Sequence, residues 1–286
     1  MGRFICATDF SGASENAIQY AGEIGQRINS DIVLFHNIDE TKEPALVAAS
    51  GESICPITRE KEQKKEARTQ MKRLQTYLEN GDEDLSLGYK SKISSGDTSQ
   101  TLATLAQEEH ADLVVLASDP SHGLQEMVDQ SLTARIIQQV PCPVLVVPGN
   151  VTFKPIRRMV LAIDLHGFCP ANMSEVLKLA GYFGAQLQLL FVLPKEEPTA
   201  RQFVEEELER ISRRLPYHRI SQHIEVNSSV EEGISQFCFN HRADMLVVGA
   251  HASNIWKHLL QPGHQQTPSY YPNLPLLVVH PKKIRF

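Results

Sequence analysis

Short runs of consecutive apolar residues alternate along the chain with stretches that have helical spacing. The clearest example runs from residue 111 to residue 148, where apolar runs at 113–116 and 144–147 flank an amphipathic stretch at about 124–139. A continuous β-branched run bounded by turn residues is typical of a strand that is covered on both faces, as in a parallel sheet. This stretch therefore predicts a strand, a polar loop, a helix and a second strand.

The same pattern returns in the second half of the chain. Ala243 lies 132 residues after Ala111, and Pro275 lies 132 residues after Pro143, so the unit recurs with its internal length unchanged. Two copies of one strand–helix–strand unit predict two domains of common origin. We place domain 1 at residues 1–149 and domain 2 at residues 150–286, joined by a short linker at 149–157 that favours packed domains.

Each half predicts the same alternation of strands and helices. The expected strands lie at 4–8, 32–35, 85–93, 113–116 and 144–147, and again at 159–163, 187–192 and 219–226, in the apolar run that begins at Ala243, and at 276–279. The expected helices include about 17–28, 60–78, 99–108, 124–139, 205–215 and 230–240. With right-handed crossovers, this order predicts an α/β fold in which each domain is a five-stranded parallel sheet with helices on both faces.

Such a sheet holds ligands at the point where the strand order reverses, between the first and fourth strands. Asp9 follows the first strand and Ala117 ends the fourth strand, so their loops should be neighbours. In the second half the corresponding pair is Asp164 and Gly249. We therefore expect one cleft in each half.

Composition and charge argue against nucleic acid and membranes as binding partners. Hydrophobic residues make up 42% and charged residues 22% of the 286 residues, which is typical of a globular protein. A net charge of −6 argues against a broad basic surface for nucleic acid. No apolar run has the length of a membrane span, and the start of the chain has no signal-peptide core, so we expect a cytoplasmic protein without a membrane partner. The five scattered cysteines favour free thiols in a reducing compartment.

Three segments give the chain a family resemblance. They are Ala-Thr-Asp-Phe-Ser at 7–11, Ala-Asp-Leu-Val-Val-Leu-Ala at 111–117 and Pro-Cys-Pro-Val-Leu-Val-Val at 141–147. Over nearly its whole length the chain resembles a tandem universal stress protein. The resemblance implies two tandem Rossmann-like (adenine nucleotide alpha hydrolase-like) domains, a role in stress response, and fifth strands that mediate the pairing of domains.

Many members of that family bind ATP through Gly-x2-Gly-x9-Gly-Ser/Thr after the fourth strand, where glycines let backbone N–H groups approach phosphate. In the first half the four positions hold Ala117, Pro120, Gln130 and Ser131. In the second half they hold Gly249, Ala252, Pro262 and Gly263. Most of the glycines are replaced by larger residues or by proline. We therefore expect ATP binding that is weakened or lost in both halves.

The resemblance and the switch-point argument together give a set of candidate residues for ligand or nucleotide binding. They are Asp9, Phe10, Ser11, Asn37, Ala117, Ser118, His122, Ser131, Thr133, Asp164 and Gly249. Several have a purely structural alternative. Asp9 and Asp164 could cap the turn into the next helix, Ser131 could be an N-cap or a surface serine, and Asn37 could be a solvated loop residue.

The chain offers no strong signal for a metal site or for catalysis. Cys238 and four histidines lie near one another in sequence, at His241, His251, His258 and His264. Zinc sites are usually built from closely spaced ligand pairs, which this group lacks. No cysteine has a histidine base at a recognisable spacing, and Ser11 is not in a nucleophile elbow. We therefore predict neither a metal nor a catalytic residue.

Three functional hypotheses follow. The first is a non-enzymatic stress-response protein that binds a ligand or partner, folded as an internal pseudo-dimer through apolar fifth strands that would otherwise be unpaired edges. The second is a nucleotide-controlled switch, in which domain 1 binds ATP and hydrolyses it slowly. The third is a carrier of a non-nucleotide small molecule in domain 2. Whether two chains also associate as a homodimer stays open.

Overall fold

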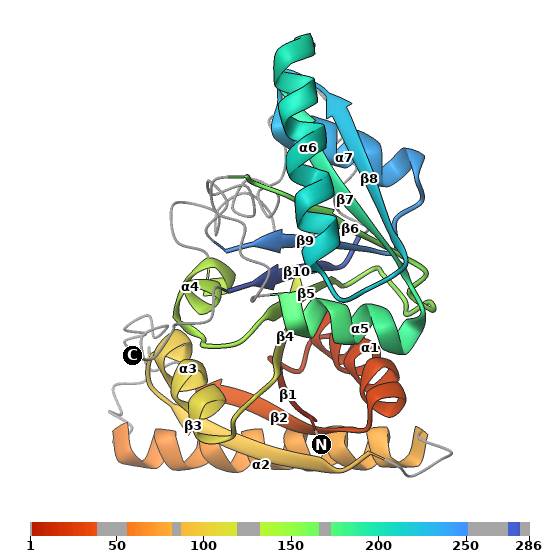
Figure 1. Ribbon diagram of the computed structural model, residues 1–286. Helices are drawn as coiled ribbons and strands as arrows, with labels where there is room; N and C mark the ends of the chain where they lie inside the picture. Colours follow the sequence, from red (N-terminus) through yellow and green to blue (C-terminus); the bar gives the residue numbers. More distant parts are fainter. Residues whose placement is uncertain are drawn as a thin grey trace.

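The computed structural model describes residues 2–38, 56–81, 87–118, 132–165, 173–250 and 274–280 (Figure 1). Within these residues the two halves repeat one alternation of strands and helices. The first half contains β1 (Gly2–Ala7), α1 (Gly12–Ile28), β2 (Ser30–Ile38), α2 (Pro56–Gly81), β3 (Tyr89–Ser95), α3 (Thr98–Glu108), β4 (Leu113–Ser118), α4 (Leu132–Gln139) and β5 (Val144–Pro148). The second contains β6 (Arg158–Ala162), α5 (Ser174–Phe183), β7 (Gln186–Leu193), α6 (Pro198–Arg214), β8 (Ile220–Val226), α7 (Val230–Asn240), β9 (Met245–Gly249) and β10 (Leu276–Val279).

The described strands join into one ten-stranded sheet. Its order is β3-β2-β1-β4-β5-β10-β9-β6-β7-β8, so each half contributes five neighbouring strands. All neighbours within a half are parallel, whereas β5 and β10 pair antiparallel, with Leu277 opposite Leu145. The predicted α/β fold and the pairing of the fifth strands are both confirmed. The boundary at residue 149 stays a prediction, although β5 ends at Pro148 and β6 begins at Arg158.

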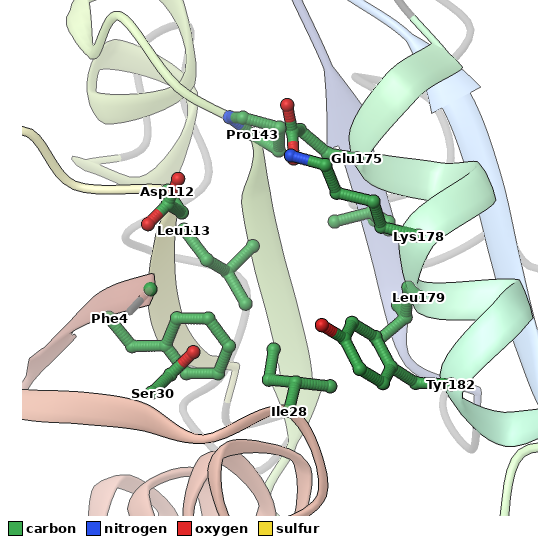
Figure 2. Close-up of a pocket in the computed structure, with 12 residues that line it drawn as sticks. Phe4, Ile28, Ser30, Asp112, Leu113, Pro143, Glu175, Lys178, Leu179 and Tyr182 are labelled. Atoms are coloured by element: carbon green, nitrogen blue, oxygen red, sulfur yellow. The ribbon is translucent and has the colours of Figure 1, made fainter.

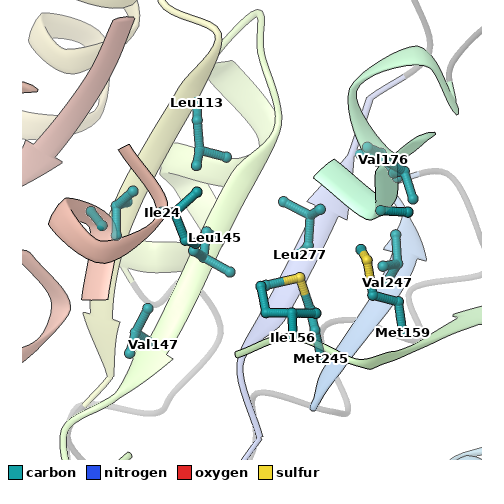
Figure 3. Packing of buried hydrophobic residues seen from close by; sticks show 14 of the residues in the cluster. Ile24, Leu113, Leu145, Val147, Ile156, Met159, Val176, Met245, Val247 and Leu277 are labelled. Carbon is teal, nitrogen blue, oxygen red and sulfur yellow. The ribbon is translucent and has the colours of Figure 1, made fainter. Parts of the chain in front are cut away.

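Two hydrophobic layers cover the sheet, and each one runs through both halves. One layer contains buried residues of α1, α2, α5 and α6, and the other contains buried residues of α3, α4 and α7. Along β5, Leu145 and Val147 belong to the first layer and Val144 and Val146 to the second, because successive strand residues face opposite sides. Figure 3 shows the first layer on both sides of the β5–β10 junction. The halves therefore share continuous cores.

The linker between the halves is packed in place. The Phe153 ring lies between two aromatic rings, 5.1 Å from the ring of Tyr20 and 6.1 Å from that of Phe183. The Arg27 guanidinium lies 4.9 Å from the centre of the Phe153 ring, a cation–π contact. The side-chain amide of Asn16 donates to the Val151 carbonyl at 2.8 Å. These contacts agree with the expectation that a short linker would hold the halves together.

Several predicted boundaries were wrong. Helix α2 begins at Pro56 and α6 begins at Pro198, earlier than the predicted starts at 60 and 205. Proline is compatible with the first turn of a helix because the N–H groups there have no intrahelical acceptor. Strand β3 is shifted toward its carboxyl end, to Tyr89–Ser95. Helix α4 is described only from Leu132, so its predicted start lies outside the described residues. No helix among the described residues is long and apolar enough to cross a membrane.

Candidate functional site

The strand order places the predicted switch point of the first half between β1 and β4. These strands pair in parallel, with Cys6 opposite Val115, so the residues after β1 and the end of β4 lie at one edge of the sheet. In the second half β6 pairs with β9, with Ala162 opposite Val248. Asp164 and Gly249 therefore lie at the corresponding edge, with Asp164 partly exposed just beyond β6. The structure brings together the strand ends that the sequence paired.

Asp9 and Ser11 form a closed turn at the first of these edges. The Asp9 carboxylate accepts from the Ser11 backbone N–H at 3.0 Å and from the Ser11 hydroxyl at 2.6 Å. Ser11 is the N-cap of α1, and its hydroxyl oxygen accepts from the Ser14 N–H at 3.2 Å. An aspartate that bonds the backbone two residues on is an Asx turn. Asp9 could contact a ligand or cap the turn into α1, and this geometry matches the cap.

The same hydrogen bonds set the ionisation of Asp9. Partial burial is the largest single influence and raises the pKa of the Asp9 carboxyl, but the bonds from Ser11 act in the opposite direction, and the pKa is lowered overall. Hydrogen bonds to the charged form of an acid favour that form. Asp9 is therefore a carboxylate at neutral pH. A negative charge at this edge opposes the approach of phosphate.

Phe10 occupies an unusual backbone position in this turn. Its φ is +64°, in the left-handed region that non-glycine residues seldom adopt. The Phe10 N–H donates to the Thr8 hydroxyl at 2.9 Å, and the ring lies 4.4 Å from the ring of His36. The His36 Nδ1 lies 2.8 Å from the Thr8 carbonyl oxygen. The ring contact and these bonds hold Phe10 over the end of β2.

Asn37 supports the backbone of the next loop. It lies inside β2, and its side-chain amide donates to the Gly96 carbonyl at 2.7 Å and to the Thr98 hydroxyl at 2.9 Å. The interpretation of Asn37 as a solvated loop residue was therefore wrong. Its side-chain nitrogen is committed to the turn between β3 and α3, because that turn follows the strand beside β2. The side-chain oxygen of Asn37 is buried, and no described residue donates a hydrogen bond to it.

The segment after β5 packs onto the edge that contains Ala117 and Ser118. The Gly149 N–H donates to the Ser118 carbonyl at 2.9 Å. A Cβ atom added at Gly149 would lie 2.8 Å from the Cβ of Ala13, so the chain passes closely over the start of α1. Both contacts fill space beside the predicted cleft.

The remaining candidates are only partly covered by the structure. Thr133 lies in the first turn of the described part of α4 and is half-buried. His122 and Ser131 lie outside the described residues, as do Pro120, Gln130, Ala252, Pro262 and Gly263. Sequence reasoning missed Thr8 and His36, which complete the first turn, and considered Ser14 only as an alternative to Ser11 for the N-cap. A hydroxyl directly after a strand could have indicated Thr8.

The thiols and histidines of the described chain do not form a metal site. No group of three or more His, Cys, Asp or Glu side chains in the described ranges could hold an ion. Cys6, Cys142 and Cys238 are buried free cysteines, and burial raises the pKa of the Cys238 thiol to about 12. A buried thiol with a raised pKa is unreactive, because the thiolate is the nucleophile. His251, His258 and His264 lie outside the described residues.

Comparison with known proteins gives a consistent family assignment. The sequence model of the Universal stress protein family matches residues 1–148. Universal stress protein Sll1388 of Synechocystis is 28% identical over 153 residues, which cover 51% of this chain and 97% of that protein. Universal stress protein MJ0577 of Methanocaldococcus jannaschii is 25% identical over 155 residues, covering 51% of this chain and 93% of that protein.

Solved structures extend the likeness in fold to nearly the whole chain. A universal stress protein from Archaeoglobus fulgidus aligns with a TM-score of 0.64 at 15% identity, covering 96% of this chain and 95% of its own. A putative universal stress protein from Pseudomonas aeruginosa aligns with a TM-score of 0.65 at 15% identity, covering 99% and 94%. At this identity the likeness concerns the fold alone.

Proposed function

Since this chain belongs to the universal stress protein family as a two-domain member, we propose that it acts by binding a ligand or a partner, without catalysis. In this proposal nucleotide binding is weakened in both halves. The binding partner is an unidentified protein or small molecule, not nucleic acid or membrane. The protein works in the cytoplasm, and its two halves serve as an internal pseudo-dimer.

One observation carries the proposal. At the carboxyl ends of β1 and β2, the Asp9 carboxylate and the Asn37 side-chain amide nitrogen are engaged by the protein's own turns. The Asp9 carboxylate is bonded to Ser11, and the Asn37 amide is bonded to Gly96 and Thr98. The replaced glycines of the ATP motif point the same way, because Ala117 stands where a family glycine would admit phosphate.

Unfolding with and without nucleotide tests this proposal. The free energy of unfolding should be measured by urea denaturation with ATP, ADP and AMP, each with and without Mg²⁺. A ligand that binds only the folded state stabilises it by about 2.7 kcal/mol at a concentration of about 100 times its Kd. We expect no such gain at millimolar nucleotide. A stabilisation of that size by ATP would contradict the proposal and favour the nucleotide-controlled switch.

Paired variants would locate any nucleotide effect. Asp9→Ala removes the carboxylate at the first switch point, and Asp164→Ala removes its counterpart in the second half. If ATP does stabilise the protein and only Asp9→Ala abolishes the gain, the site lies between β1 and β4. A gain that neither substitution changes would place nucleotide binding elsewhere in the chain.

A further inference from the structure

A pocket lies between the two halves, away from both switch points. Figure 2 shows its walls: the amino ends of first-half strands on one side and α5 on the other. Its lining includes residues of β1, β2 and β4 from the first half and of α5 and β10 from the second. The pocket has a volume of about 320 Å³, at the lower end of the range for small-molecule sites. Neither half forms it alone.

The body of the pocket is apolar. Phe4 of β1 and Leu113 of β4 form the wall on the first half, and both are largely buried. Leu179 of α5 and Leu277 of β10 form the wall on the second half. An apolar ring or chain placed between these walls would be removed from water on two sides, which is the main source of affinity in such sites.

One polar group deep in the pocket lacks a partner. Ser30, at the start of β2, is only 2% exposed, and its hydroxyl oxygen has no hydrogen-bond partner among the described residues. Gly2 keeps the space beside it open, since an added Cβ there would lie 2.4 Å from the Ser30 hydroxyl oxygen. Buried polar groups are nearly always hydrogen-bonded, so an unpaired hydroxyl lining a pocket indicates a group that a ligand could satisfy.

The rim of the pocket is negatively charged. Glu175 and Lys178, one turn apart on α5, form an ion pair at 3.1 Å and offset each other. The Asp112 carboxylate accepts from the Arg3 backbone N–H at 2.8 Å, and its charge, like that of Glu175, raises the pKa of Lys178. The described rim therefore has two carboxylates, Asp112 and Glu175, and one ammonium group, Lys178, so its net charge is one negative unit. An anion such as a phosphate would meet repulsion here, whereas an ammonium group would meet attraction.

We propose that this pocket binds a small amphipathic amine. Its apolar ring or chain lies between the Phe4–Leu113 wall and α5, and its ammonium group lies beside Asp112. Tyr182, which is 59% exposed and points its hydroxyl toward the pocket in Figure 2, covers the ring from the second half. This inference rests on the ligand-binding function proposed above and assigns it a site distinct from the nucleotide clefts.

The charge preference can be tested with three probes that share an indole ring. Tryptamine has an ammonium group, tryptophol has a neutral hydroxyl and indole-3-acetate has a carboxylate. Binding of each to the full chain should be measured by isothermal titration calorimetry at one ionic strength. We expect tryptamine to bind about tenfold more tightly than tryptophol, as one partly screened charge pair would give, and indole-3-acetate to bind least.

Two matched pairs of variants locate the site. Asp112→Asn should weaken tryptamine binding several-fold and leave tryptophol binding unchanged. Asp244→Asn is its control, because Asp244 lies 132 residues later and caps Arg157 and Arg158 in the same way without lining the pocket. Tyr182→Ala should weaken both probes, whereas Phe203→Ala, at a similarly exposed aromatic of α6, should weaken neither. Circular dichroism checks that each of the four variant proteins is folded.

The outcomes separate this proposal from the function on which it rests. Saturable tryptamine binding that Asp112→Asn reduces and Asp244→Asn does not would support the pocket. Absence of saturable binding, or equal effects of the two substitutions, would overturn it while leaving weakened nucleotide binding intact. Conversely, strong stabilisation by ATP would overturn the proposed function and leave the result for the pocket unchanged.

Discussion

A single hydroxyl organises the turn after β1. Ser11 caps α1 through its oxygen and also donates its hydroxyl proton to Asp9, so one side chain satisfies a helix N–H and a carboxylate together. A serine N-cap satisfies one of the free N–H groups at the start of a helix. The turn is therefore stabilised by its own residues and needs no ligand to keep its shape.

This arrangement predicts the effect of Ser11→Ala on stability. We expect a loss of about 1 kcal/mol in the free energy of unfolding, the usual cost of removing a serine N-cap. Ser11→Thr should retain most of the stability, because threonine keeps the hydroxyl. Urea denaturation of the native protein and the two variants at pH 7 measures their order of stability. Equal midpoints for Ser11→Ala and the native protein would contradict this prediction.

The same substitution should change the dependence of stability on pH. The pKa of Asp9 is lower in the folded protein than the value of about 3.9 expected when unfolded, so its contribution is complete above that value and disappears as pH falls through the folded pKa. Ser11→Ala removes the hydroxyl bond, which is one of the bonds that lower this pKa, and leaves the backbone N–H bond in place. Carboxyl NMR titration should therefore show a higher Asp9 pKa in the variant.

At the scale of elements, β8 and α7 are joined by stacked rings. The rings of Phe237 and His241 stack with centres 3.8 Å apart, and the His223 ring lies 5.0 Å from that of Phe237. Burial, and then the nearby charge of His241, lower the pKa of His223. Folding therefore favours the neutral form of His223. Its stabilising effect is complete above the unfolded pKa of about 6.5 and is lost as pH falls below that value.

We predict that His241→Gln raises the pKa of His223 and makes stability less sensitive to pH. The substitution removes the like charge that opposes protonation of His223, although burial continues to lower its pKa. NMR titration of the His223 ring gives the pKa directly, and urea midpoints at pH 7.5 and 5.5 give the effect on stability. His218→Gln, at an exposed histidine just before β8, should change neither. An unchanged His223 pKa in His241→Gln would refute the coupling.

The elements themselves were largely predictable from the sequence. Buried parallel strands appear as continuous apolar runs, so β4 and β5 could be predicted directly from the sequence. The 132-residue repeat then predicted β9 and β10 at the equivalent positions of the second half. Edge strand β3 was misplaced because none of its residues is buried, so its sequence has weak periodicity. The role of Asn37 could not be predicted, since its partners Gly96 and Thr98 follow a strand that is adjacent only in the folded sheet.

At the scale of the whole molecule, the seam between the halves creates what neither half contains. The sequence predicted two clefts at the carboxyl ends of strands, and the structure places those strand ends together. The pocket between the halves was not predicted, because its walls combine Phe4 and Leu113 of the first half with residues of α5 in the second. Local patterns determine strands and helices, but this relative placement arises only from the joined sheet.

The joined sheet also predicts that the two halves unfold together. Leu277 of β10 and Leu145 of β5 are opposite each other and nearly fully buried, in a layer that contains residues of both halves. Leu277→Ala should cost about 2–5 kcal/mol, the usual range for truncating a buried leucine. Because the core is continuous, this loss should reach the first half as well as the second.

Native-state hydrogen exchange measures where that loss appears. In the native protein, the most protected amides of β1 and β6 should exchange with the same free energy, that of global unfolding. In Leu277→Ala both sets should fall by the same amount, although β1 lies in the other half. Phe239→Ala, at an exposed aromatic of α7, should leave both unchanged. Protection that falls in β6 and persists in β1 would mean that the halves unfold separately. In that case the two halves would share one sheet but would not unfold cooperatively.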